Sequence, residues 1–312
     1  MSVVQHPDAH EPQPQDPELV TPDGSAAADP VRPPRRKAFI RFARQQPFGL
    51  AALVLIAFFV TVALLAPWIA PYDPLQQHRR SIMVAPNAEH WFGTDDLGRD
   101  VLSRTLFGAR TSLLVAVATL ALGGVIGVVL GMLSGYLGGT WVDTVIQRVM
   151  DTLMAIPSIV LLLFVAALLG PSIRNTVIAL SLLVVPQFNR VTRGEMLRIR
   201  EETFVEAARS IGASPWRILT RYGLPNLMAP LFVLTSLVFA VLMIAESALS
   251  FLGIGTPPPT PSWGRMLSDG SNSLEIAPWM AFYPGLALSI SVLAFNLLGD
   301  AMRDFLDPKQ RR

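Results

Sequence analysis

Long runs of apolar residues alternate with short polar stretches along most of this 312-residue chain. A helix needs about 20 mostly apolar residues to cross the hydrocarbon core of a bilayer. This criterion predicts about six transmembrane helices, at Phe48–Ile69, Ser112–Leu133, Thr152–Leu169, Thr176–Val191, Leu227–Leu252 and Met280–Met302. Because the runs are continuous rather than alternating, they do not fit membrane-spanning strands. The pattern therefore predicts an all-α, multi-pass protein of the cell membrane.

The basic residues predict the orientation, because Lys and Arg gather in short segments on the cytoplasmic side of a membrane. With six spans, one side receives the basic cluster at 32–44, the arginines between residues 190 and 221, and the basic C-terminal end. The long loop after the first span also carries arginines, but it holds several carboxylates as well. We therefore expect both termini in the cytoplasm.

Composition divides the chain into four parts. The N-terminal residues are acidic, rich in proline and free of aromatic residues, which is typical of a disordered tail. We expect this tail at 1–31, followed by a basic flank, the first transmembrane helix and an outer loop at 32–110. A helical core at 111–304 contains a polar loop at 190–225, and a cytoplasmic tail occupies 305–312.

Glycines recur at every fourth residue of the second predicted span, at Gly123, Gly127, Gly131 and Gly135. Small residues at this spacing form a smooth ridge that lets another helix backbone approach closely. Glycine is also common in membrane helices, which is the alternative explanation. We interpret the run of four as a helix-packing face within the bundle or between subunits.

The polar loop at 190–225 carries its own helix signals. Thr203 and Glu206 have the form of a capping box, which predicts a helix start directly after Thr203. Gly212 is placed to end that helix as its C′ residue. Ser214 and Pro215 then read as a second N-cap with proline in the first helical position. The loop is therefore predicted to hold two short helices with a glycine break between them.

A first helix of about eight residues is marginal in water when isolated. It persists only if it packs against something, and the alanines at its centre allow close approach. The alternative is a solvated, arginine-rich loop on the cytoplasmic side of the membrane. The physics of the loop leaves both interpretations open.

A resemblance to a known family favours the interpretation that the short helix packs against a partner. The polar loop resembles the cytoplasmic loop of ATP-binding-cassette (ABC) importer permeases at Glu206, Ala207, Ala208, Gly212, Leu224 and Pro225. Tyr222 stands where the family pattern has isoleucine. Further stretches are HWFGTDDLGRDVLSR at 90–104, ESALSFLG at 246–253, PSWGR at 261–265 and NLLGD at 296–300. From residue 40 onward, the chain resembles the second, C-type permease subunit of dipeptide, oligopeptide and nickel importers.

The resemblance implies the fold and the partners of the chain. It implies a type I ABC importer permease fold, with the core at 111–304 as the permease domain. A homologous second permease, two ABC ATPase subunits and an extracytoplasmic solute-binding protein would be its partners, within membrane lipid and without nucleic acid. The imported solutes would be peptides first and nickel or another small solute second.

In this family, the short cytoplasmic helix couples the permease to the ATPase. The resemblance therefore implies coupling roles for four residues of the loop. Glu206 would serve as cap and contact, Ala207 and Ala208 would allow close approach, and Gly212 would supply the break.

The chemistry that the sequence lacks is also informative. There is no Gly-x-x-x-x-Gly-Lys-Ser/Thr phosphate loop, so ATP and magnesium would be bound by the partner ATPases. His-Glu-x-x-His and Gly-x-Ser-x-Gly are absent, and cysteine is absent too. We therefore expect no catalytic residue, metal site or cofactor on this chain, which makes a membrane enzyme the poorer hypothesis.

Three polar residues inside or near the predicted spans are candidates for the translocation pathway, because burying such groups in lipid is costly. They are Glu246, Asn296 and Asp300. Glu246 could face a polar pathway, pair with Arg99 or Arg265, or reach interfacial water. For Asp300, a structural pair with Arg303 one turn away is the favoured interpretation.

For Arg99 and Asp100, we expect a role in folding the outer loop. A second class of function is an ion-driven secondary transporter. Such a protein needs intramembrane charges arranged for coupling and usually an internal repeat. Neither feature is visible in this sequence.

Overall fold

The computed structural model describes residues 46–306, which belong to one compact unit. The acidic tail at 1–31, the basic cluster at 32–44 and most of the tail at 305–312 lie outside the described residues. Within 46–306 the chain is helical, and its only bridge of strand type joins Thr94 and Asp100. The predicted all-α class is confirmed for this part of the chain.

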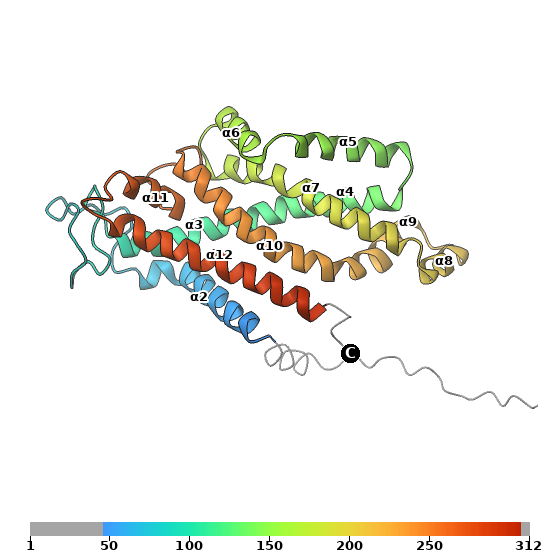
Figure 1. The fold of residues 1–312 in the computed structure, drawn as a ribbon, viewed down its shortest axis with the longest axis horizontal. Helices are drawn as coiled ribbons and strands as arrows, with labels where there is room; N and C mark the ends of the chain where they lie inside the picture. The colour runs from blue at the N-terminus through green and yellow to red at the C-terminus, as the bar shows by residue number, and fades with distance from the viewer. Residues whose placement is uncertain (1–45, 307–312) are drawn as a thin grey trace, which may run out of the picture. The chain divides into compact units, whose positions relative to one another are not determined.

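Figure 1 shows the helices side by side, coloured in chain order from blue at α2 to red at α12. In chain order they are α2 (Pro47–Ile69), α3 (Val101–Thr119), the π-helical η1 (Leu120–Gly124), α4 (Val125–Tyr136), α5 (Trp141–Ala155), α6 (Ser158–Leu169), α7 (Ile173–Ile199), α8 (Thr203–Ser210), α9 (Pro215–Arg217), the π-helical η2 (Ile218–Gly223), α10 (Leu224–Phe251), α11 (Trp263–Ser271) and α12 (Trp279–Leu306). The short α8 lies at the end of the bundle where α2 begins and α12 ends, and the segment at 70–100 lies at the opposite end (Figure 1). The cytoplasmic orientation of these ends stays a prediction.

Four helical stretches of the described residues are long and apolar enough to cross a membrane. They are Pro47–Ile69, Val101–Tyr136, Pro215–Phe251 and Trp279–Phe305. A fifth span results if α5 and α6, which are bent by 93° relative to each other, count as one. By length and composition, the described residues therefore contain four or five of the roughly six predicted spans.

The third and fourth predicted spans account for the difference. The third, Thr152–Leu169, is divided between α5 and α6 because Pro157 disfavours a helical conformation at the preceding residue. Ile156 is accordingly extended, with φ −85° and ψ 129°. The fourth, Thr176–Val191, lies inside the longer helix α7, which is too polar for a span by composition. Its C-terminal part alone carries Arg190, Arg193, Glu195 and Arg198.

Glycines permit a close helix approach between α7 and the stretch formed by η1 and α4. The four regularly spaced glycines all face α7, and they are Gly123, Gly127, Gly131 and Gly135. A Cβ atom on Gly127 would lie 2.6 Å from the carbonyl oxygen of Val185 and 2.7 Å from Cβ of Phe188. On Gly135 it would lie 2.7 Å from Cβ of Met196. We call this contact the glycine seam.

A methyl group placed in the glycine seam should destabilise the protein. We expect Gly127→Ala to cost about 1–3 kcal/mol, because the backbone of α7 has to move away. The matched control is Gly194→Ala in α7, where nothing lies within 4 Å of the added Cβ. There we expect no loss, or a small gain from the higher helix propensity of alanine. Thermal denaturation of the detergent-solubilised protein measures both, and equal midpoints would contradict the seam.

Candidate functional site

Helix α8 begins at Thr203, but its start is not the predicted capping box. Glu202 is the N-cap, and no side chain caps the helix. The first turn is held by the backbone, where the N–H of Val205 donates to Glu202 O at 2.9 Å. Thr203 therefore lies inside the helix, one residue beyond its predicted place, and Glu206 provides an acidic group in the first turn.

The C-terminus of α8 ends on Gly212 as predicted. Gly212 has φ +81°, a conformation that glycine adopts without steric cost. Its N–H donates to Arg209 O at 2.9 Å, and the N–H of Ala213 donates to Ala208 O at 3.0 Å. These two bonds are those of a Schellman motif. The turn after α8 is thus held by hydrogen bonds as well as by glycine.

The second helix signal is also present, but the helix does not stop. The Ser214 side chain accepts from the N–H of Arg217 at 3.4 Å, with Pro215 in the first turn. From there α9, η2 and α10 continue as one stretch over Pro215–Phe251. The wider π turn ends shortly before Pro225, which has no N–H to donate. Helix α7 extends to Ile199, and the next long helical stretch begins at Pro215. Between these two residues, only α8 and its two short connections remain of the predicted polar loop at 190–225.

The predicted coupling residues lie on different sides of α8. Val205 and Ala208 form its buried face, with 0% and 3% exposure. Glu206, Ala207 and Gly212 are exposed. Ala208 thus packs against the protein itself, so the structure leaves three of the four residues available to a partner. The exposed apolar residues beside them are Ile211 and Trp216, at 84% and 74% exposure.

Two further contacts attach α8 to the bundle. Phe204 stacks with Tyr222 of η2 at a ring-centroid distance of 6.2 Å. Arg209 lies over the ring of Tyr136, the last residue of α4, at 5.6 Å from its centroid. Tyr222, which departs from the family pattern, therefore has a partner on α8 itself.

A partly buried ion pair near this end of the bundle was not predicted. Arg193 of α7 donates from Nε and Nη2 to the two carboxylate oxygens of Asp143 in α5, at 2.7 and 2.8 Å. Asp143 also accepts from Ser134 Oγ of α4 at 2.5 Å. The bidentate geometry makes this a strong pair, and it links three helices. The sequence did hold one local signal for the position of Asp143. Thr140 is the N-cap of α5, and its side chain accepts a hydrogen bond from the N–H of Asp143.

Glu246 is fully buried and has no arginine partner. It accepts from Ser112 Oγ of α3 at 2.9 Å and from Ser250 Oγ of α10 at 2.7 Å. Ser112 Oγ in turn accepts from the N–H of Trp263 in α11 at 3.4 Å. Glu246 therefore joins three helices at the end of the bundle that holds the segment at 70–100, and the alternative in which it reaches interfacial water is wrong.

The alternative in which Glu246 pairs with Arg99 or Arg265 is also wrong, because both arginines bind carboxylates in their own segments. Arg99 Nε lies 2.6 Å from Asp95 Oδ2. Arg265 Nε lies 3.0 Å from Asp269 Oδ1. Burial raises the pKa of the Asp269 carboxyl above its usual value, and the charge of Arg265 acts in the opposite direction.

The two candidates in α12 are not joined to Glu246. Asn296 is half-buried, and its Nδ2 donates to Val292 O of the preceding turn at 3.1 Å. Asp300 is exposed, and none of the ion pairs within 46–306 joins it to Arg303. The predicted Asp300–Arg303 pair is therefore wrong. Within residues 46–306, no hydrogen bond or ion pair brings Glu246, Asn296 and Asp300 together.

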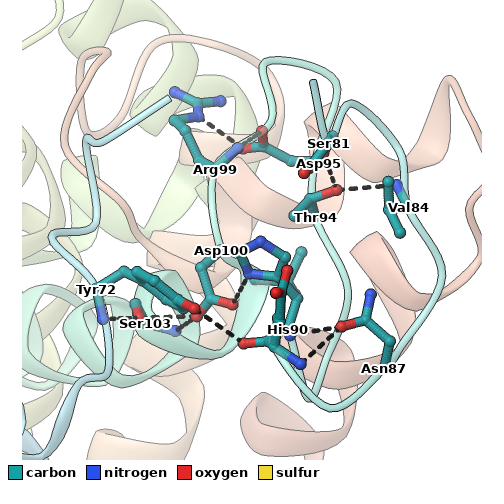
Figure 2. A network of polar contacts seen from close by, with 12 residues as sticks. Tyr72, Ser81, Val84, Asn87, His90, Thr94, Asp95, Arg99, Asp100 and Ser103 are labelled. Carbon is teal, nitrogen blue, oxygen red and sulfur yellow. Dashed lines mark hydrogen bonds and ion pairs between the residues drawn. The ribbon is translucent and has the colours of Figure 1, made fainter. Parts of the chain in front are cut away.

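The segment at 70–100 folds around Asp100, as Figure 2 shows. Asp100 caps α3 by accepting from the N–H of Ser103 at 2.7 Å, and it binds His90 Nδ1 at 2.9 Å. Thr94 accepts from the N–H of Val84 at 2.9 Å and donates to Ser81 O (Figure 2). The predicted folding role of Arg99 and Asp100 is confirmed, since Arg99 binds Asp95 in the same segment.

Removing the Glu246 carboxylate should destabilise the packing of α3, α10 and α11. We expect Glu246→Ala to lower the thermal midpoint strongly, because two buried hydroxyls lose their acceptor at about 1–3 kcal/mol each. Glu246→Gln keeps one oxygen acceptor and the volume, so its loss should be much smaller. The control is Glu201→Ala, an exposed carboxylate at the opposite end. If Glu246→Ala melts like Glu201→Ala, the three-helix role of Glu246 is wrong.

Two models of known protein families match separate parts of this chain. Residues 127–312 match the family model of the binding-protein-dependent transport system inner membrane component. Residues 34–86 match the N-terminal transmembrane domain of oligopeptide transport permease C.

Curated relatives cover the chain almost completely. The glutathione transport system permease protein GsiD of Escherichia coli O157:H7 is 45% identical over 282 residues, which is 90% of this chain and 92% of the relative. A protein of Brucella suis biovar 1, provisionally named a peptide transport system permease, is 42% identical over 94% of this chain and 98% of the relative. This chain therefore belongs to the family of inner membrane components of binding-protein-dependent transport systems.

Proposed function

We propose that this chain is the permease subunit of an ATP-driven importer of short peptides and forms half of its translocation pathway. The substrate class is supported by the relatives, which are named for glutathione and peptide transport. The observation that carries the coupling role is α8 itself, a short helix at one end of the bundle with a fixed turn and an exposed face (Figure 1).

The proposed assembly contains a homologous second permease, two ABC ATPase subunits and an extracytoplasmic solute-binding protein. This chain is non-catalytic in the proposal and binds no cofactor. Its sequence has no phosphate-binding loop, so ATP and magnesium belong to the ATPase subunits. Glu206, Ala207 and Gly212, which are exposed on and next to α8, would contact the ATPase together with Ile211.

The proposed mechanism uses α8 as a mechanical link. Movement of the ATPase subunits displaces α8, and the hydrogen-bonded turn at Gly212 passes the displacement to Pro215–Phe251, which continues without a break. Packed helices respond by shifting as bodies because protein interiors have low compressibility. The pathway between the two permeases would thereby alternate between its two openings.

Reconstitution tests the proposed function. In proteoliposomes that contain this chain, its co-encoded partner permease, the ATPases and the binding protein, we expect uptake of labelled glutathione or short peptides only with ATP. Uptake by the chain alone, driven by an ion gradient, would contradict the proposal and favour a secondary transporter.

The turn at Gly212 gives a second prediction. Gly212→Ala should reduce ATP-dependent uptake several-fold, because a side chain at φ +81° costs about 1–2 kcal/mol and loosens the turn. The matched control is Gly170→Ala, since Gly170 also has positive φ (+80°) and nothing within 4 Å. Uptake and ATP hydrolysis are measured on the same vesicles. If the two variants lose uptake equally, backbone strain rather than coupling explains the loss.

A further inference from the structure

We propose that Arg209 and Tyr136 form the contact through which α8 moves the glycine seam, and that both act as positioning residues for coupling. This inference rests on the proposed function, because it assumes that a partner displaces α8. It adds a path to α4, which is not a sequence neighbour of α8.

The chain connects α8 directly only to α7 and to Pro215–Phe251. The buried face of α8 is small, because it consists of Val205 and Ala208. Arg209 also reaches α4, with its guanidinium 5.6 Å from the centroid of the Tyr136 ring. A guanidinium at this distance from the face of a tyrosine ring is attracted by the electrons of the ring.

Arg209 is free for this contact. Other arginines near it bind carboxylates, since Arg193 pairs with Asp143 and Arg198 pairs with Glu202. Among the ion pairs of residues 46–306, none includes Arg209. Its head group therefore has the ring of Tyr136 as its defined partner.

Tyr136 lies at the end of the glycine seam that is nearest to α8, where a displacement of α8 would be passed to α4. It follows Gly135, whose added Cβ would lie 2.7 Å from Cβ of Met196 in α7. Met196 is fully buried, and its Sδ lies 3.0 Å from the position of a Cβ on Gly223 in η2. Met196 thus lies between α4 and η2. The backbones of α4 and α7 are closely packed next to Tyr136. A shift of Tyr136 would therefore move these helices, because a close-packed interior has low compressibility.

The stacking of Phe204 on Tyr222 provides a second attachment near the start of α8. Phe204 and Arg209 are five residues apart, roughly 7.5 Å along the helix. Helix α8 is therefore held near both ends, by η2 at one and by α4 at the other. A displacement of α8 would move both helices together rather than rotate α8 about one contact.

A double-mutant cycle in the reconstituted complex tests the link. The variants are Arg209→Ala, Tyr136→Leu, the two combined, and Tyr136→Phe as the control that keeps the ring. We measure uptake of labelled glutathione per ATP hydrolysed, copurification of the ATPases, and the thermal midpoint. Each single variant should lower the uptake per ATP about fivefold, as expected for the loss of one weak contact. The double variant should be no worse than either single one, and Tyr136→Phe should match the unmodified protein.

Several outcomes overturn this inference. If the effects of the two substitutions multiply, Arg209 and Tyr136 act separately. If Arg209→Ala releases the ATPases, Arg209 binds the partner rather than Tyr136. If Tyr136→Leu keeps the normal ratio while the unmodified complex transports with ATP, the inference fails and the proposed function stands. If the unmodified complex shows no ATP-dependent uptake, the proposed function itself fails.

Discussion

The close approach of α7 to η1 and α4 is the constraint on which the rest of the structure depends. Four glycines at every fourth position bring the helix backbones so close that a single methyl group would collide with α7. In a membrane, where lipid is as apolar as the side chains, helices associate mainly through such packing. The seam continues at one end to Gly135 and Met196, where α8 and η2 meet the bundle.

Two clusters of hydrogen-bonded polar side chains link helices near opposite ends of the bundle. Near α8, Asp143 and Arg193 link α4, α5 and α7. At the other end, Glu246 joins α3, α10 and α11 through serine hydroxyls. An unsatisfied polar group in an apolar surrounding is expensive. Both clusters therefore favour one arrangement of the helices and penalise alternatives in which their partners separate.

Much of the candidate site was predictable because its signals are local. Gly212, Ser214 and Pro215 act through bonds to residues a few positions away, so their roles follow from spacing alone. The prediction of a capping box at Thr203 and Glu206 was wrong. The N-cap of α8 is Glu202, and no side chain forms a capping hydrogen bond. Predictions about ion pairs failed more often, since Arg99, Arg265 and Asp300 each had several possible partners. Which carboxylate an arginine meets depends on helix rotation, which sequence spacing does not determine.

By itself, the sequence determined the helical class, the apolar character of most spans, the glycine ridge and the turn after α8, because each depends on backbone geometry or local bonds. Only the tertiary structure decided that α5 and α6 are bent by 93° relative to each other. It also decided that Glu246 is buried and accepts hydrogen bonds from Ser112 and Ser250. It alone decided that Ala208 faces inward while Glu206 and Ala207 face out. These features arise from contacts between residues far apart in the chain, where the face that a helix buries is set by its neighbours.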